Sequence, residues 1–408
     1  MGRATAHTQT VVAHITSKMN RLIILAVIIT IVGCSEPIKY DFVIQNVGLF
    51  DGHQDVGTVN IAINKDTIAE ITTEELIGDS HIDGSGKYVI PGMVNAHVHV
   101  STIEDLQTGY PLGILTIMNM HTGLEEREFE WKTISKDSVG FSSLYGSGHA
   151  ATVPGGHPNQ FSPDMETISD SLSIKDWVDR RIAKKVDYIK IVREHHEWMG
   201  YPALPTLSYE QIRQLIEYAH SKDCKVVVHA NTVEEMMKIA EFKPDGFVHM
   251  LDYKEDYPVP ESYYNALAES GAFVVSTGGI ALKPMDNAPP FVQEWVKSNL
   301  LDAEQRAEII KHLHEYGIII VAGTDAQEGQ MDFGSNYYLE LDLYRKAGLS
   351  NVEILKAATG NAAEAFNLPI GELQIGSKAN MILLEDNPLI DIENLKKVEQ
   401  VWKNGKTK

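Results

Sequence analysis

Residues 89–99 read VIPGMVNAHVH, an apolar run that ends in two histidines one residue apart, His97 and His99. Alternate side chains of an extended strand point to the same face, so we expect both imidazoles to point to one place. Imidazole is a ligand of zinc and its neighbours among the divalent metals. A lone His-x-His pair also occurs at surfaces and in cores, so a metal site requires further ligand-type residues at later strand ends.

Length and composition limit the classes of protein. The chain has 408 residues, 43% of them hydrophobic, which is enough for a large core and suits a barrel with an appendage. The formal net charge of -21 argues against a nucleic-acid partner, which requires a basic surface. An acidic soluble enzyme for small neutral or cationic molecules fits this charge, and no sequence feature indicates an oligomeric state.

The first 34 residues have the pattern of an export signal. Lys18 and Arg21 precede a short apolar run over 22–32, which is too short for a membrane-spanning helix of roughly 20 residues. The ending Ile-Val-Gly-Cys34 resembles the lipobox of bacterial lipoproteins, in which the cysteine is lipidated. We therefore predict a signal peptide with lipobox over 1–34 and an exported lipoprotein on the periplasmic side of the cell envelope, at the outer membrane, with the lipid as its only membrane contact. A buried strand or an anchor helix is the alternative.

Met19 is a second candidate start, because beginning there would give a compact signal of ordinary shape, and we hypothesise that it replaces Met1. Cys224 is the other cysteine of the chain. If Cys34 carries lipid, Cys224 has no disulfide partner, and we interpret it as a buried structural thiol.

Both ends of the remaining chain contain short strand-like runs separated by turn residues. These runs lie at 42–44, 60–63, 67–71, 380–384 and 398–402. We predict that residues 35–90 and 370–408 together form one small β-domain, a β-sandwich.

Strand and helix patterns alternate over 91–369. Three helices begin with capping-box pairs, namely Ser208 with Gln211, Asp302 with Gln305 and Ser350 with Glu353. Repeated alternation favours parallel strands joined by crossover helices, and the span is close to the roughly 250 residues of a (β/α)8 TIM barrel. An α/β fold built on this barrel is our prediction, with a doubly wound open sheet as the alternative.

Ligand-type residues recur where these predicted strands end, which in such a barrel is the place of the active site. They are His97, His99, Lys190, His229, His249 and Asp325. Each has an ordinary explanation alone: a core histidine, an edge lysine or an aspartate that caps a helix. Their recurrence on successive units of one barrel predicts a metal centre.

The order His-x-His, Lys, His, His, Asp resembles the amidohydrolase superfamily, whose members are (β/α)8 barrels with one or two divalent metals. Further matching segments are 89–99, 347–350, 357–363, 371–380 and 386–389. Residues 153–158, which contain Gly155-Gly156-His157, resemble the branch of imidazolonepropionase-like proteins and prolidase-like dipeptidases. Tyr338 stands where many relatives have histidine, which suggests an altered substrate pocket.

The resemblance implies a role for each ligand. His97, His99 and Asp325 would hold one metal, His229 and His249 the other, and Lys190 would bridge the two as a carbamate. A salt bridge of Lys190 to a carboxylate, with a single metal, is the alternative. Zinc is the default for histidine-rich ligation, and manganese or iron fits the same residues.

These assignments predict an exported metal-dependent amidohydrolase that uses a metal-activated hydroxide on a carbon–nitrogen bond of a small amide, dipeptide or cyclic amide. Asp325 would accept the water proton and return it to the leaving nitrogen, and His157 would assist the oxyanion. The segment 193–196 could meet a substrate carboxylate. A superfamily deaminase and a noncatalytic solute-binding lipoprotein are the alternative functions.

Overall fold

The computed structural model describes residues 38–197, 202–327 and 332–408. The predicted signal, both candidate starts and Cys34 lie outside the described residues. Among the helices of the described part, none is long and apolar enough to cross a membrane.

Strands from both ends of the described chain pair in one seven-stranded sheet. Its order is β16-β15-β5-β1-β2-β3, and β4 pairs with β1. These strands are β1 (Lys39–Phe50), β2 (Asp55–Asn64), β3 (Thr67–Thr72), β4 (Ile77–Asp83), β5 (Tyr88–Pro91), β15 (Met381–Leu384) and β16 (Val398–Trp402). Apolar side chains from opposite ends of the sequence, such as Ile44, Leu383 and Trp402, share one buried cluster of this sheet. Their burial explains why the two ends stay together.

Two further sheets consist of parallel strands. One has the order β14-β6-β7-β8 and the other β13-β12-β11-β10-β9. Their bounds are β6 (Met93–His99), β7 (Ile114–Asn119), β8 (Ser143–Gly146), β9 (Ile189–Val192), β10 (Val226–His229), β11 (Gly246–Val248), β12 (Phe273–Val275), β13 (Ile320–Val321) and β14 (Ala326–Gln327). The N–H of Ala151 donates to the carbonyl of Lys190, and the N–H of Ala96 donates to the carbonyl of Ala322. Backbone hydrogen bonds therefore connect the two sheets at both of their edges.

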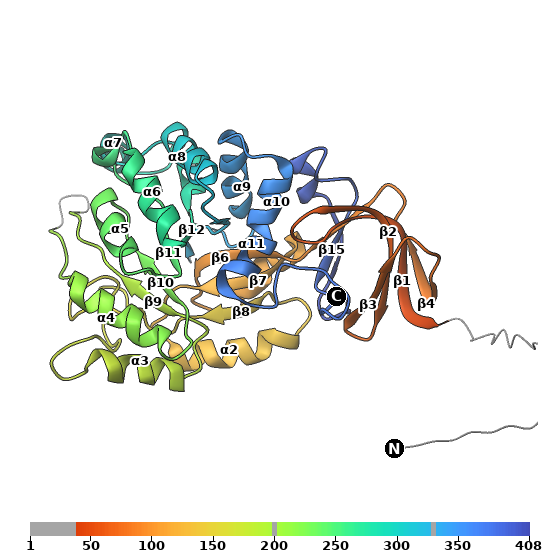
Figure 1. Cartoon of the computed structure of the whole chain (residues 1–408), viewed down its shortest axis with the longest axis horizontal. Helices are drawn as coiled ribbons and strands as arrows, with labels where there is room; N and C mark the ends of the chain where they lie inside the picture. Colours follow the sequence, from red (N-terminus) through yellow and green to blue (C-terminus); the bar gives the residue numbers. More distant parts are fainter. Residues whose placement is uncertain (1–37, 198–201, 328–331) are drawn as a thin grey trace, which may run out of the picture. The chain divides into compact units, whose positions relative to one another are not determined.

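Helices follow most of these strands and surround them (Figure 1). They are α1 (Asp105–Thr108), α2 (Glu125–Asp137), α3 (Ile174–Ala183), α4 (Tyr209–His220), α5 (Val233–Ala240), α6 (Glu261–Ser270), α7 (Pro290–Asn299), α8 (Ala303–Glu315), α9 (Tyr337–Lys346), α10 (Asn351–Ala358) and α11 (Gly360–Phe366). All three predicted capping boxes are confirmed, at the starts of α4, α8 and α10. The chain is therefore a mixed α/β protein, as predicted.

The parallel strands bury both of their faces, which is typical of strands covered by helices. In β10, Val226 and Val228 belong to a large cluster that includes helix residues, whereas Val227 belongs to a second cluster with Val94 of β6 and Val321 of β13. The strands are apolar along their length, and polar residues that remain buried appear where they end, as at His229 and His249.

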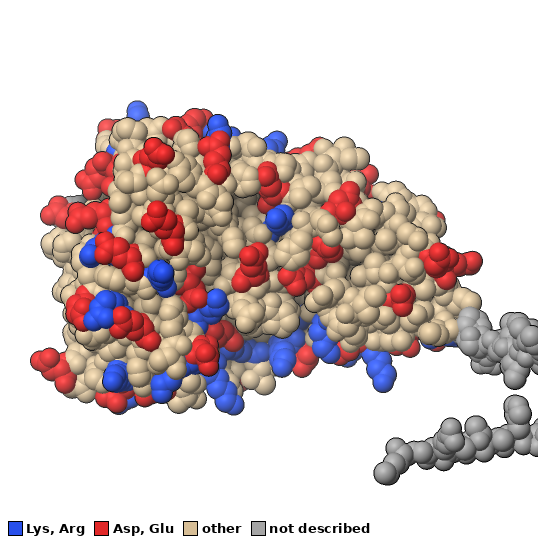
Figure 2. Space-filling view, in the orientation of Figure 1, with Lys and Arg blue, Asp and Glu red and all other residues tan. Residues whose placement is uncertain are grey.

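The surface carries the acidic excess of the sequence. Figure 2 shows Asp and Glu spread over the visible face, with Lys and Arg between them and more frequent near its lower edge.

Candidate metal centre

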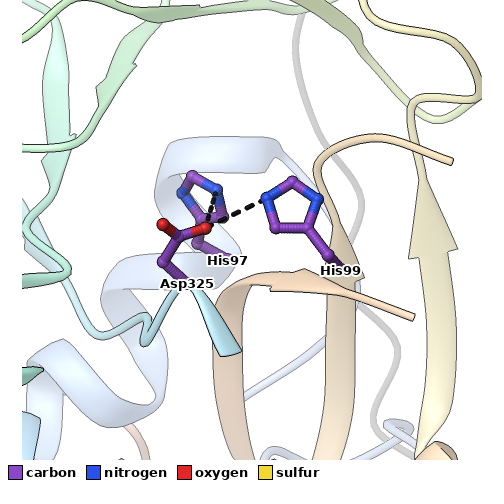
Figure 3. Close-up of side chains that lie close together, drawn as sticks. All are labelled: His97, His99 and Asp325. Atoms are coloured by element: carbon purple, nitrogen blue, oxygen red, sulfur yellow. Dashed lines mark ion pairs between the residues drawn. The ribbon is translucent and has the colours of Figure 1, made fainter. Parts of the chain in front are cut away.

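His97, His99 and Asp325 point toward one another (Figure 3). The Nε2 atoms of His97 and His99 lie 3.2 and 3.0 Å from the same carboxylate oxygen, Oδ1 of Asp325. Val98 between the two histidines points to the helix side of β6, so the two imidazoles share the other face, as the alternation predicts. The structure thus brings together the first predicted ligand set.

Local hydrogen bonds explain how Asp325 reaches the histidines of β6. The Asn95 side chain donates to Thr324 Oγ1 at 2.9 Å, and the N–H groups of Thr324 and Asp325 donate to the carbonyl of His97. Asp325 has a φ of 55°, a left-handed conformation that aspartate tolerates better than most residues. Gly323 leaves no room for a side chain, since an added Cβ would lie 2.9 Å from the backbone nitrogen of His97.

His229 and His249 continue the site from the next strands. Their ring centroids are 4.4 Å apart, and the ring of His249 is 4.6 Å from that of His97. His229 Nε2 lies 3.0 Å from Glu194 Oε2, and His249 Nδ1 lies 2.9 Å from Thr277 Oγ1. The four histidines therefore form one continuous cluster, and both rings of the second pair have a polar partner that fixes their orientation.

Lys190 is buried in β9, with 2% of its surface exposed. Burial lowers the pKa of its amine to about 7. Lys190 pairs with Val227 of the neighbouring strand β10, two residues before His229. A neutral amine in this position is the form that carbamate formation requires.

The electrostatics of the cluster favour the metal-binding protonation states. Burial, with the neighbouring Lys190, lowers the pKa of His97 to about 3, so this imidazole is neutral. Burial alone would raise the pKa of Asp325, but the imidazoles of His97 and His99 hold it well below its usual range. Neutral imidazoles and an ionised carboxylate are the ligands that a divalent metal needs.

His157 lies beside the second pair, with its ring centroid 5.7 Å from that of His229. Its Nδ1 is 2.6 Å from the amide nitrogen of Gln160, and burial lowers its pKa to about 3. Because the Gln160 amide nitrogen donates to Nδ1, the neutral His157 ring carries its proton on Nε2.

Two buried histidines near the site were missed by the sequence analysis. His121 follows β7 and accepts a hydrogen bond from the N–H of Ala150, while its Nε2 lies 3.0 Å from Ser162 Oγ. His149 follows β8 and accepts a hydrogen bond from the N–H of Glu166. The signal that identified His229, a histidine after an apolar strand, applies equally to His121. Both ring nitrogens of His121 therefore have protein partners, Ala150 and Ser162. We interpret His121 as a residue that supports the loop containing Ser162, and not as a metal ligand.

The donor set of the first cluster fits a divalent metal. Ligand atoms of His97, His99 and Asp325 all lie within 4.8 Å of one another. Both ring nitrogens of His97 are buried and make no hydrogen bond of acceptable geometry, which is costly unless another partner binds them.

A second group of potential ligands has a different character. Glu125, His149 and Glu166 also lie close together, but both carboxylates form ion pairs with the buried guanidinium of Arg181. Lys184 pairs with Glu125 as well. Because cations already compensate these carboxylates, we interpret the group as an ion-pair network.

Two further expectations, for Tyr338 and Cys224, can be compared with the structure. The Tyr338 hydroxyl donates to the carbonyls of Leu112 and Leu395, before β7 and β16, so the suggested role of this residue in the substrate pocket is wrong. Burial raises the pKa of the Cys224 thiol to about 11, which agrees with a structural thiol.

Arg193 is already engaged by the protein. Its Nη1 donates to the carbonyl of Leu207, its Nε lies 2.8 Å from Glu235 Oε1, and its guanidinium stacks 4.1 Å from the ring centre of Tyr209. It lines a pocket of about 390 Å³ with His195, His196, Glu255 and other polar residues. This arrangement leaves little of the Arg193 charge for a substrate carboxylate.

Comparison with known proteins finds relatives of similar sequence. The chain is 24% identical over 371 residues to ochratoxinase of Aspergillus niger, an alignment that covers 78% of this chain and 75% of the relative. It is 23% identical over 386 residues to 5'-deoxyadenosine deaminase of Methanocaldococcus jannaschii, covering 85% and 86%.

Solved structures share the fold. A Xaa-Pro dipeptidase with bound methionine superposes with a TM-score of 0.74 at 20% identity, over 90% of this chain and 99% of the other. The A. niger ochratoxinase gives a TM-score of 0.70 at 18% identity, over 90% and 95%. The model of the amidohydrolase family matches residues 154–408, more than half of the sequence, and the chain therefore belongs to the amidohydrolase family.

Proposed function

We propose that this protein is a metal-dependent hydrolase of carbon–nitrogen bonds that acts on a small amide, dipeptide or cyclic amide. The observation that carries the proposal is the convergence of His97, His99 and Asp325 on one point, with the His229–His249 pair adjoining it. The family membership of the chain and its similarity to a Xaa-Pro dipeptidase and to ochratoxinase support this reaction class.

In this proposal His97, His99 and Asp325 hold one divalent cation, and His229 and His249 hold a second. Lys190, as the neutral amine, would react with carbon dioxide and release one proton; the resulting carbamate, with one negative charge shared by two oxygens, would be a further ligand for the cations. Bound cations, with zinc as our first choice, lower the pKa of water and polarise a carbonyl group. His97 and His249 contribute neutral imidazoles, because burial keeps their pKa below the ordinary range.

Asp325 and His157 have the proposed catalytic roles. The lowered pKa of Asp325 keeps its carboxylate ionised but makes it a weak base, so in the proposal it accepts a proton from water whose own pKa a bound cation would lower. The same carboxyl group then returns this proton to the leaving nitrogen. His157 is neutral and can donate Nε2–H to the oxygen that becomes negative during attack on the carbonyl.

A deaminase is the second candidate, because several similar proteins carry adenosine or adenine deaminase names. Both reactions replace nitrogen on carbon by oxygen from water. The buried Lys190 favours the amide hydrolase, since a lysine that bridges two metals has no role in a single-metal deaminase.

We further propose that β6–β13 form a closed (β/α)8 barrel over 91–369. The hydrogen bonds at both sheet edges support this closure. The seven-stranded sheet, from 35–90 and 370–408, would fold over its own apolar cluster as a β-sandwich. Export with a lipid on Cys34, placing the enzyme at the periplasmic side of the envelope, completes the proposal and rests on the sequence pattern alone.

The test is a substrate screen with zinc-loaded full chain and its Asp325→Asn variant. We expect release of free amine from dipeptides or N-acyl amino acids and a 10²–10⁴-fold lower rate for D325N. Adenosine derivatives in the same screen test the deaminase. Zinc-loaded protein that turns over neither class would contradict the proposal and favour the solute-binding lipoprotein.

A further inference from the structure

Glu340 of α9 is a buried carboxylate that is not itself a proposed ligand, with 1% of its surface exposed. It accepts a hydrogen bond from the Ser276 hydroxyl and from the N–H groups of Gly278 and Gly279, at 3.3 and 2.5 Å for the two amides. Burial raises the pKa of the Glu340 carboxyl, and these donors oppose the rise. A buried carboxylate is costly, so its three donors within one short segment indicate a role for that segment.

The segment that Glu340 holds contains Thr277. Its residues 276–279 follow β12, and Glu340 binds the residues on both sides of Thr277. Thr277 has a φ of 49°, a left-handed conformation that is unfavourable for a β-branched residue. Such a conformation persists only where the surroundings impose it.

Close packing adds to this constraint. An added Cβ at Gly279 would lie 2.5 Å from the backbone nitrogen of Glu340, so α9 and the segment are in direct contact. The Ser276 hydroxyl also lies 2.7 Å from the hydroxyl of Tyr344, one turn further along α9. Helix α9 thus fixes the segment through both hydrogen bonds and packing.

The strained conformation places the Thr277 hydroxyl on a proposed metal ligand. Thr277 Oγ1 lies 2.9 Å from Nδ1 of His249. When Nδ1–H donates to this oxygen, the lone pair of the neutral ring is on Nε2 and is free for a metal. If Thr277 rotated away, it would no longer fix the orientation of the His249 ring, nor which ring nitrogen carries the proton.

We infer that Glu340 is a positioning residue of the metal centre, holding Thr277 in the conformation that orients His249. The inference rests on the proposed function, because it assigns His249 to a metal. Glu340 acts through two intermediates, Thr277 and then His249, and touches neither substrate nor metal.

The experiment measures the zinc affinity of the full chain by chelator competition in four variants. Glu340→Gln and Thr277→Val should each weaken binding by about 10–100-fold, the usual effect of losing an outer-shell partner. Thr277→Ser keeps the hydroxyl and should restore affinity to within a few-fold of the unmodified chain. Because both losses act on one ring, the E340Q/T277V double variant should lose no more than either single variant.

The matched control is Asp245→Asn. Asp245 is also a mostly buried carboxylate that accepts a backbone N–H, that of Val226, but it lies at the opposite end of β10. A purely structural role of Glu340 predicts that E340Q and D245N retain the same zinc affinity, and that result would overturn the inference. If E340Q does not fold, the zinc affinity of Ser276→Ala is measured instead. This substitution removes one hydrogen bond to Glu340. Unchanged zinc affinity in S276A would then overturn the inference, and a several-fold loss would support it.

A second readout separates this inference from the proposed function. The ¹⁵N–¹H correlation spectrum of the metal-free chain reports the tautomer of His249 without metal or substrate. E340Q and T277V should shift the His249 ring from a single Nδ1–H tautomer to a mixture, whereas D245N should not. If the unmodified chain binds no zinc but this shift occurs, the proposed function fails and the positioning by Glu340 stands. An unshifted tautomer in E340Q refutes the positioning.

Discussion

Replacing Gly323 by alanine tests how tightly the two ligand-bearing segments are joined. An added Cβ at this position would lie 2.5 Å from Val275 Cγ1, 2.9 Å from His97 N and 3.0 Å from His97 Cβ. Carbon atoms need about 3.5 Å, so β6 and the segment before Asp325 must separate by roughly half an ångström. Overpacking of this kind costs about 1–3 kcal/mol of the free energy of unfolding. The same displacement separates His97 from Asp325, and we expect a loss of rate of up to about 10²-fold.

Gly317→Ala is the matched control for this substitution. Gly317 precedes β13, whereas Gly323 follows it; Gly317 has a φ of 73° and no atom within 4 Å of an added Cβ. G317A should therefore cost roughly 1 kcal/mol through backbone strain alone and leave the rate unchanged. Urea unfolding of the metal-free chains and hydrolysis by the zinc-loaded chains measure the two effects. Equal zinc affinity and equal rate in G323A and G317A would refute the claim that Gly323 sets the distance between His97 and Asp325.

Three other predictions follow from buried charges. Lys190→Met should lower the bound zinc from two ions to one per chain, measured by elemental analysis after dialysis, and an unchanged content would contradict the carbamate bridge. Burial raises the pKa of Glu128 from 4.5 to about 7. Between these two pH values the carboxyl group therefore keeps its proton in the native chain and loses it in the unfolded chain. The contribution of Glu128 to the free energy of unfolding therefore falls by about 3 kcal/mol as the pH rises from 4.5 to 7, and Glu128→Gln should lack this slope in urea titrations at several pH values. Arg181→Met leaves the carboxylates of Glu125 and Glu166 without their buried partner and should destabilise the chain by about 3–5 kcal/mol, whereas a loss below about 1 kcal/mol would show that Lys184 and Arg180 suffice.

Most of the proposed ligands could be located from the sequence because they lie toward or just after the end of an apolar strand, whereas Lys190 lies inside β9. His229 ends β10, and His249 follows β11 by one residue. In parallel strands these ends lie on one side, so position along the strand determines position in space. Helix starts were equally predictable, since a capping box involves residues only three positions apart, as Ser350 and Glu353 show.

The supporting interactions could not be predicted because their partners are far apart in the sequence. Glu340 binds residues 61 to 64 positions earlier, and Asn95 binds Thr324 across 229 positions. No local pattern identifies such a partner. Strand β12 ends at Val275, two residues before Thr277. The left-handed Thr277 and the hydrogen bonds of Glu340 end the strand there, and neither is visible in an apolar pattern.

The buried polar groups of this chain support a functional interpretation of one end of the parallel strands. At that end the protein buries His97, Lys190, His249 and Glu340. His97 has two nitrogens without hydrogen bonds, and Lys190 has a lowered pKa, so neither gains enough from the protein to offset its burial. Arg181, equally buried elsewhere, has two carboxylate partners and needs no further explanation. Uncompensated burial at the strand ends is expected only if a ligand supplies the missing interactions. Metal binding should therefore raise the stability of the chain, and a Tm that zinc leaves unchanged would remove the physical reason for this cluster.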